Sequence, residues 1–132
     1  MASILVVDDD PDVAEAIQAI LERGGFHVVV ANGAEAGLEA LQKQEFEIVV
    51  TDLIMPKVNG LELIRRLRLQ HPRVRVIAIS GGGSLGPLSL KPDAISTHAF
   101  IAAARDAGAE EVLTKPFDMD DMVAAIRRHL PN

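Results

Sequence analysis

The chain has no cysteine, no tryptophan and no tyrosine among its 132 residues. Without cysteine it can form neither a disulfide nor a metal site with thiolate ligands. Its four histidines are scattered and lack the spacing typical of metal ligands: His27, His71, His98 and His129. We therefore expect any metal site in this chain to be built from oxygen ligands, which favour hard cations.

Basic residues are also few, with 13 Lys and Arg against 19 Asp and Glu and a net charge of -6. An acidic balance of this kind disfavours nucleic acid as a direct partner. No apolar run is long enough to span a membrane, and a strand starting at Ile4 begins too early for a signal peptide. We therefore expect a cytoplasmic protein with no direct nucleic-acid or membrane partner, forming one domain over residues 1–132.

Short apolar runs alternate with amphipathic stretches five times along the chain. The runs predict buried strands at 4–7, 27–31, 48–51, 74–79 and 112–114. The stretches between and after them predict helices at about 11–23, 33–44, 60–70, 93–107 and 119–130. Four residues are expected to cap helix starts: Asp10, Asn32, Asn59 and Asp118.

This alternation predicts an α/β fold, a doubly wound parallel sheet of five strands with five helices on its two faces. For five strands we expect the flavodoxin-like order 2-1-3-4-5, which places the switch point between the first and third strands. Asp8 and Asp9 follow the first strand and Asp52 follows the third. The fold thus predicts that these three carboxylates converge on one crevice.

Three carboxylates in one crevice repel one another and need a cation to remain ionised together. Oxygen ligands with open positions favour Mg²⁺. Ser80 ends the fourth strand and Lys115 follows the fifth, so a hydroxyl and an ammonium group are expected at the same edge. Carboxylates, Mg²⁺, a hydroxyl and an ammonium group together suit a phosphoryl group.

With these residues the chain resembles the receiver domain of two-component response regulators. The resemblance rests on the stretches 7–11 and 50–56 with Gly60, on Ser80, and on 115–117, and it covers the whole chain. It implies that Asp52 accepts a phosphoryl group. It also implies that Asp9, Asp52 and the backbone carbonyl of Ile54 bind Mg²⁺, with Asp8 acting partly through water.

The resemblance further implies that Ser80 hydrogen-bonds the phosphoryl group and that the Lys115 ammonium group pairs with it. It also implies that the Lys115–Pro116 peptide bond is cis. The donor would be a phosphohistidine on a sensor histidine kinase or a phosphotransfer protein. Such a domain is not an enzyme acting on other substrates, because it catalyses only its own phosphorylation and dephosphorylation. The signal would leave by protein contacts to a downstream target that the sequence does not name, and a homodimer is left open.

Two features depart from the family pattern. Val112 occupies the position where the family usually carries Tyr or Phe, the ring that turns inward on activation. The interval from Ser80 to Lys115 is longer than is typical, and its glycine-rich stretch 81–92 is predicted to switch between mobile and ordered states. Since no output domain is expected in these 132 residues, the chain is either a stand-alone regulator or a receiver taken from a longer protein.

Three other interpretations fit parts of the sequence. Gly81, Gly83 and Gly86 spell G-x-G-x-x-G, but Pro87 argues against the helix that a dinucleotide site needs there. Asp8 and Asp10 form a D-x-D pair that could make Asp8 the nucleophile of a phosphohydrolase. The third is a pseudo-receiver, an interaction module that takes no phosphoryl group.

Overall fold

The structure, a computed structural model, describes residues 2–53, 60–80, 94–114 and 118–130, and only the backbone of 94–100. Within these ranges, five strands form one parallel sheet in the order β2-β1-β3-β4-β5, which confirms the predicted order and fold class. The strands are β1 (Ser3–Val7), β2 (His27–Ala31), β3 (Ile48–Asp52), β4 (Arg75–Ser80) and β5 (Glu111–Thr114). β3 and β4 each extend one residue further than predicted, so Asp52 and Ser80 are the last residues of their strands.

One helix follows each strand. The helices are α1 (Pro11–Arg23), α2 (Ala34–Lys43), α3 (Gly60–Gln70), α4 (Ala94–Ala107) and α5 (Met119–His129). The predicted caps of α1 and α5 are confirmed. The Asp10 carboxylate accepts hydrogen bonds from the backbone N–H groups of Asp12 (3.0 Å) and Val13 (3.5 Å). Asp118 forms a reciprocal capping box at the start of α5.

The predicted start of the second helix is wrong. Gly33, not Asn32, precedes the first turn of α2, and no side chain caps this helix. Close packing against the sheet, rather than a cap, holds this helix. A Cβ added to Gly37 would lie 2.9 Å from a methyl carbon of Val7, so α2 is pressed closely against β1. This contact fixes where the helix lies, whereas a cap alone contributes only about 1 kcal/mol.

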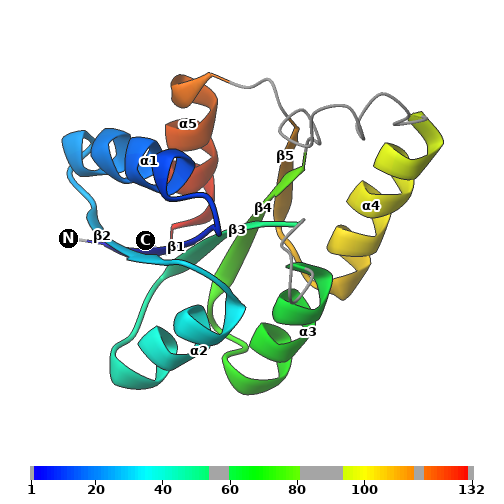
Figure 1. The fold of residues 1–132 in the computed structure, drawn as a ribbon, viewed down its shortest axis with the longest axis horizontal. Coiled ribbons are helices and arrows are strands. Elements are labelled where there is room, and N and C mark those ends of the chain that lie inside the picture. Colours follow the sequence, from blue (N-terminus) through cyan, green and yellow to red (C-terminus); the bar gives the residue numbers. More distant parts are fainter. Residues whose placement is uncertain (1, 54–59, 81–93, 115–117, 131–132) are drawn as a thin grey trace.

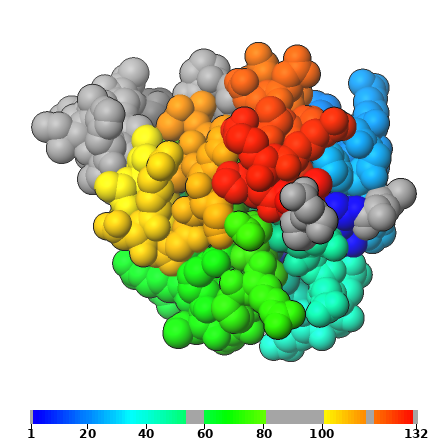
Figure 2. All heavy atoms as spheres, turned by 180° about the vertical axis from the view of Figure 1, so that it is seen from behind, coloured from blue at the N-terminus to red at the C-terminus, as the bar shows by residue number. Residues whose placement is uncertain are grey.

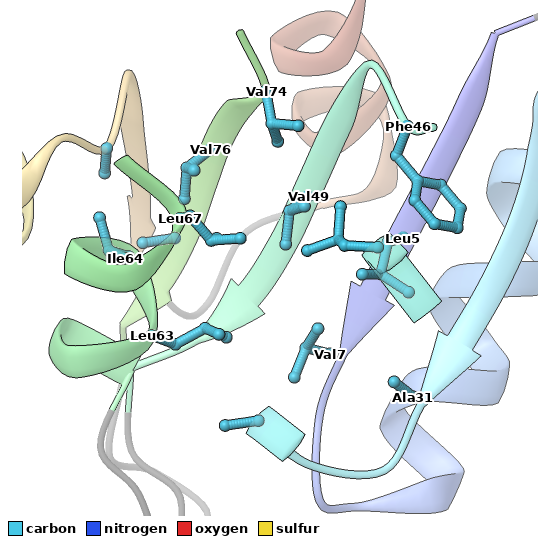
Figure 3. Packing of buried hydrophobic residues seen from close by; sticks show 14 of the residues in the cluster. Leu5, Val7, Ala31, Phe46, Val49, Leu63, Ile64, Leu67, Val74 and Val76 are labelled. Carbon is cyan, nitrogen blue, oxygen red and sulfur yellow. The ribbon is translucent and has the colours of Figure 1, made fainter. Parts of the chain in front are cut away.

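Two apolar cores cover the two faces of the sheet. On one face α2, α3 and α4 pack on the strands, and Leu63, Ile64 and Leu67 of α3 are fully buried in the same apolar core as Leu5 and Val49 (Figures 1 and 3). On the other face α1 and α5 cover the strands with their own apolar stripes. Burial on both faces explains why the strands are continuous apolar runs without alternation.

Seen from behind, the orange-to-red α5 lies between the blue segments near the N-terminus and the yellow-to-orange α4 (Figure 2). Its apolar side chains Met122, Ala125 and Ile126 are completely buried. In the part of the chain that the structure describes, no helix combines the length and the apolar character needed to cross a membrane.

The C-terminal turn of α5 is tied to the start of β5 by a charged cluster. The Glu111 carboxylate accepts hydrogen bonds from Arg128 at 2.5 Å and lies 2.9 Å from His129 Nε2. Partial burial would raise the pKa of the Glu111 carboxyl, but hydrogen bonds and charge from Arg128 and His129 outweigh it, so the pKa lies below the ordinary 4.5. The cluster therefore stabilises the fold when Glu111 is ionised.

A depressed folded-state pKa predicts the sign of the pH dependence. The contribution of Glu111 should be fully present above pH 4.5 and should be lost as the pH falls through the lower folded-state value. We expect Glu111→Gln to lower the free energy of unfolding at neutral pH, and the gap to wild type to close in acid. Urea unfolding at a series of pH values measures this difference in the free energy of unfolding.

Glu39→Gln, at an exposed position of α2, is the control and should change stability by less than about 0.5 kcal/mol. A gap that stays constant into acid would contradict the assignment.

Candidate functional site

The acidic site begins where β1 ends. Asp8 is buried, with 3% of its surface exposed, and its N–H donates to the Ala31 carbonyl at 3.1 Å. Its carboxylate accepts a hydrogen bond from the Asp10 N–H at 2.9 Å. The first bond continues the β1–β2 ladder one residue past β1, and the second ties the Asp8 side chain to the backbone of Asp10. Asp8 is thus held within the fold while Asp9 next to it is exposed.

Pairing between β1 and β3 brings the third carboxylate to the same place. Val7 is in register with Thr51, so Asp8 and Asp52 are the next residues along the two neighbouring strands. Carboxylate oxygens of Asp8, Asp9 and Asp52 all lie within 4.8 Å of one another. The proximity expected from the strand order is therefore present, with one buried, one exposed and one half-buried carboxylate.

The donor set at this site is chemically uniform. Three carboxylates supply only oxygen atoms, which are the ligands that hard divalent cations prefer. Like charges this close repel one another, and a cation between them would relieve the repulsion. On its ligand chemistry the cluster could hold a divalent cation such as Mg²⁺.

Of the remaining predicted site residues, the structure describes Ser80 but not the others. Ser80 is the last residue of β4 and is buried, with 5% of its surface exposed. It follows Ile79, which is in register with Asp52, so Ser80 lies at the end of the strand next to β3. Ser80 is itself in register with Thr114, the last residue of β5, and Lys115 is the next residue in the chain. Lys115, the Lys115–Pro116 bond, the Ile54 carbonyl and the stretch 81–92 lie outside the described residues.

Val112, at the unusual position on β5, pairs with Ala78 of β4. It is half-buried and packs against the apolar core on the α2, α3 and α4 face. A small aliphatic side chain therefore occupies the position at which the resemblance implies a mobile aromatic ring.

Two residues beside Asp52 make contacts that the sequence does not indicate. The Thr51 hydroxyl donates to the backbone carbonyl of Asp52 at 3.0 Å. Gly60 packs so closely on the same backbone that an added Cβ would overlap the Asp52 carbonyl oxygen. Both residues lie in the stretches that carry the family resemblance, but these contacts depend on the three-dimensional fold and the sequence does not indicate them.

A five-stranded doubly wound sheet with three carboxylates at its switch point is typical of α/β domains that bind their ligands at the carboxyl ends of the strands. Residues 4–88 match the response regulator receiver domain family. A response regulator receiver protein, CpdR of Brucella abortus, is 33% identical over 98% of both chains. The chain belongs to the response regulator receiver domain family.

Other relatives agree with this assignment. The chain is 31% identical to the uncharacterized transcriptional regulatory protein YkoG of Bacillus subtilis over 96% of its own length, but it spans only 50% of that protein. A receiver domain protein from Clostridium thermocellum superposes with a TM-score of 0.82 at 29% identity, covering 98% of this chain and 94% of that one. Receiver domains are in general signalling modules rather than enzymes.

Repulsion within the acidic cluster leads to a prediction about stability without and with metal. Asp52→Asn should raise the melting temperature of the metal-free protein, because one of three crowded charges is removed. Mg²⁺ should raise the melting temperature of wild type as well. At 100 times its dissociation constant it should add about 2.7 kcal/mol to the free energy of unfolding. Thermal melts in EDTA and in MgCl₂ measure both effects. Asp106→Asn, at an exposed position of α4, is the control. A metal-free Asp52→Asn protein that melts below wild type would count against crowding.

Proposed function

We propose that this chain is a phosphoacceptor receiver domain that takes a phosphoryl group onto Asp52 in a Mg²⁺-dependent reaction. The observation that carries the proposal is the position of Asp52 at the end of β3, with carboxylate oxygens of Asp8 and Asp9 within 4.8 Å. Membership of the receiver domain family supports it.

In the proposed reaction a carboxylate oxygen of Asp52 attacks the phosphorus of a phosphohistidine. A P–O bond forms as the P–N bond breaks, and the electron pair of that bond leaves with the imidazole, which takes up a proton from water. Hydrolysis of the resulting acyl phosphate returns the carboxylate and inorganic phosphate. The chain thereby catalyses its own phosphorylation and dephosphorylation and no other reaction.

The metal would be held by Asp8, Asp9 and Asp52, together with the backbone carbonyl of Ile54. Bound there, Mg²⁺ supplies positive charge that neutralises the phosphoryl oxygens. The Asp10 N–H donates a hydrogen bond to the Asp8 carboxylate and so restrains the position of this ligand. Ser80 at the end of β4 would donate its hydroxyl to the phosphoryl group, and Lys115 would pair with it.

The partners follow from this chemistry. The donor would be a sensor histidine kinase or a phosphotransfer protein in the cytoplasm, and the output a contact with a downstream protein rather than with nucleic acid. Because the chain spans about half the length of several relatives, such as YkoG, activities of those whole proteins are not assigned to it.

A pseudo-receiver is the second candidate, and Val112 is the observation that favours it. With a small side chain packed at this position of β5, a phosphorylation signal would have to leave the site without the ring motion typical of the family.

The two candidates separate in one experiment. Wild-type protein is incubated with acetyl phosphate and MgCl₂, and its intact mass is recorded. The receiver proposal expects an added mass of one phosphoryl group that depends on Mg²⁺ and disappears in EDTA. An unchanged mass at every acetyl phosphate concentration would overturn it in favour of the pseudo-receiver.

A further inference from the structure

We propose that Thr51 and Gly60 are positioning residues for the acceptor: they fix the peptide unit between Asp52 and Leu53, and through it the direction of the Asp52 carboxylate. The inference rests on the proposed function of Asp52. Neither residue touches the reacting atoms, so both would act through Asp52.

The first contact comes from within β3. Thr51 is completely buried, and its hydroxyl donates a hydrogen bond of 3.0 Å to the Asp52 carbonyl oxygen. A buried hydroxyl needs a partner, and here that partner is the backbone of the acceptor itself. The bond restrains rotation of the Asp52 carbonyl.

The second contact comes from the start of α3. The Gly60 Cα faces the same peptide unit, and an added Cβ would lie 2.7 Å from the Leu53 Cα and overlap the Asp52 carbonyl oxygen. The Gly60 N–H also donates to the Leu53 carbonyl at 2.9 Å. Only a residue without a side chain allows α3 to begin this close to the acceptor's backbone.

The other side of the peptide unit is fixed by the sheet. The Leu53 N–H donates to the Ile79 carbonyl of β4 at 3.0 Å. With its N–H and its C=O both engaged, the peptide unit after Asp52 cannot rotate freely. Since the backbone on both sides of the Asp52 Cα is then fixed, the direction of its Cβ is fixed as well. The carboxylate keeps only its own side-chain torsions, which suits a nucleophile that has to meet a phosphorus atom in line.

A purely structural role makes a different prediction. If Thr51 and Gly60 served packing alone, substitutions would lower stability and leave metal affinity and phosphorylation unchanged in the protein that is still folded. Displacements as small as about 1 Å can cost 100-fold in rate, so a positioning role should show in those two quantities.

The experiment compares four variants with wild type. Thr51→Val removes the hydroxyl and keeps the shape, whereas Thr51→Ser keeps the hydroxyl and removes a methyl group. Gly60→Ala introduces the clash at the acceptor's backbone. Gly24→Ala is the matched control, because its Cβ would be crowded at 3.3 Å by Leu21 and Phe26 at the far end of α1. For each protein we would measure the melting temperature, the dissociation constant for Mg²⁺ by calorimetry, the initial rate of phosphorylation by acetyl phosphate, and amide exchange at Leu53.

We expect Thr51→Val to slow phosphorylation by about tenfold, to weaken Mg²⁺ binding and to speed exchange of the Leu53 amide. Thr51→Ser should restore the rate to within about twofold of wild type although it lacks a buried methyl group. Gly60→Ala should act in the same direction as Thr51→Val, and Gly24→Ala should leave Mg²⁺ affinity and the phosphorylation rate unchanged whatever it does to the melting temperature.

The inference is overturned if Thr51→Val matches wild type in Mg²⁺ affinity and rate, or if Thr51→Ser loses as much as Thr51→Val. Should Gly60→Ala fail to fold, the Thr51 pair decides the question alone. A wild type that takes up neither Mg²⁺ nor a phosphoryl group would overturn the proposed function and this inference with it, an outcome distinct from a defect confined to the variants.

Discussion

Asp52→Asn should abolish phosphorylation by acetyl phosphate. The amide keeps the size of the carboxylate but lacks the anionic oxygen that would attack phosphorus. Because Asp52 lies at the end of β3 and is half-buried, the substitution should leave the fold intact. Intact-mass measurement after incubation with acetyl phosphate and MgCl₂ should show the added phosphoryl group in wild type and none in the variant.

Asp106→Asn makes the same chemical change at an exposed position of α4 and should be labelled like wild type. Peptide mapping of the labelled wild type provides a second check, since the phosphoryl group should be found on the peptide that contains Asp52. Undiminished labelling of Asp52→Asn, or a label on Asp8, would refute the assignment. A label on Asp8 would favour the D-x-D alternative, in which Asp8 is the nucleophile.

Leu67→Ala should lower the free energy of unfolding by about 2–5 kcal/mol. Leu67 is completely buried where α3 packs on the sheet, beside Leu63 and Ile64 (Figure 3). Truncation there removes apolar contacts and leaves a cavity that rigid strands cannot close. A loss of this size is a large part of the 5–15 kcal/mol that holds a typical domain together.

The control for this prediction lies on the same helix. Leu69 is 84% exposed, so Leu69→Ala makes the identical substitution without creating a cavity and should change stability by less than about 0.5 kcal/mol. Urea unfolding of the two variants under the same conditions gives the comparison. Similar losses in both would mean that burial on this face of the sheet does not determine the stability of the chain.

Most of the fold could be predicted from local pattern and the rules for parallel sheets. The β-branched runs marked all five strands, and alternation with helices limited the strand order to a few choices. Asp10 and Asp118 were predicted correctly as caps because their hydrogen bonds are local. Asn32 was predicted wrongly, because α2 begins after Gly33 without a side-chain cap and is held by close packing of Gly37 against Val7 of another element.

The candidate site also has residues that the strand order predicts and contacts that only the folded structure reveals. Asp8, Asp9 and Asp52 could be identified because parallel strands bring their carboxyl ends to one edge, a rule that needs no atomic detail. The contacts of Thr51 and Gly60 with the Asp52 carbonyl could not, because they depend on the distance between α3 and β3. Glu111, Arg128 and His129 were missed for a related reason, since the sequence gives no sign that the end of α5 reaches the start of β5.

The pairing of β1 with β3 has a consequence for how the chain folds. Between these strands in the sequence lie α1, β2 and α2 in full, so the pair forms only when a long loop closes. Contacts of this kind have high contact order and slow the folding of a domain. The same pairing brings Asp8 and Asp52 together, so their mutual repulsion opposes it. We therefore expect a divalent cation, which would relieve this repulsion, to speed refolding of the chain.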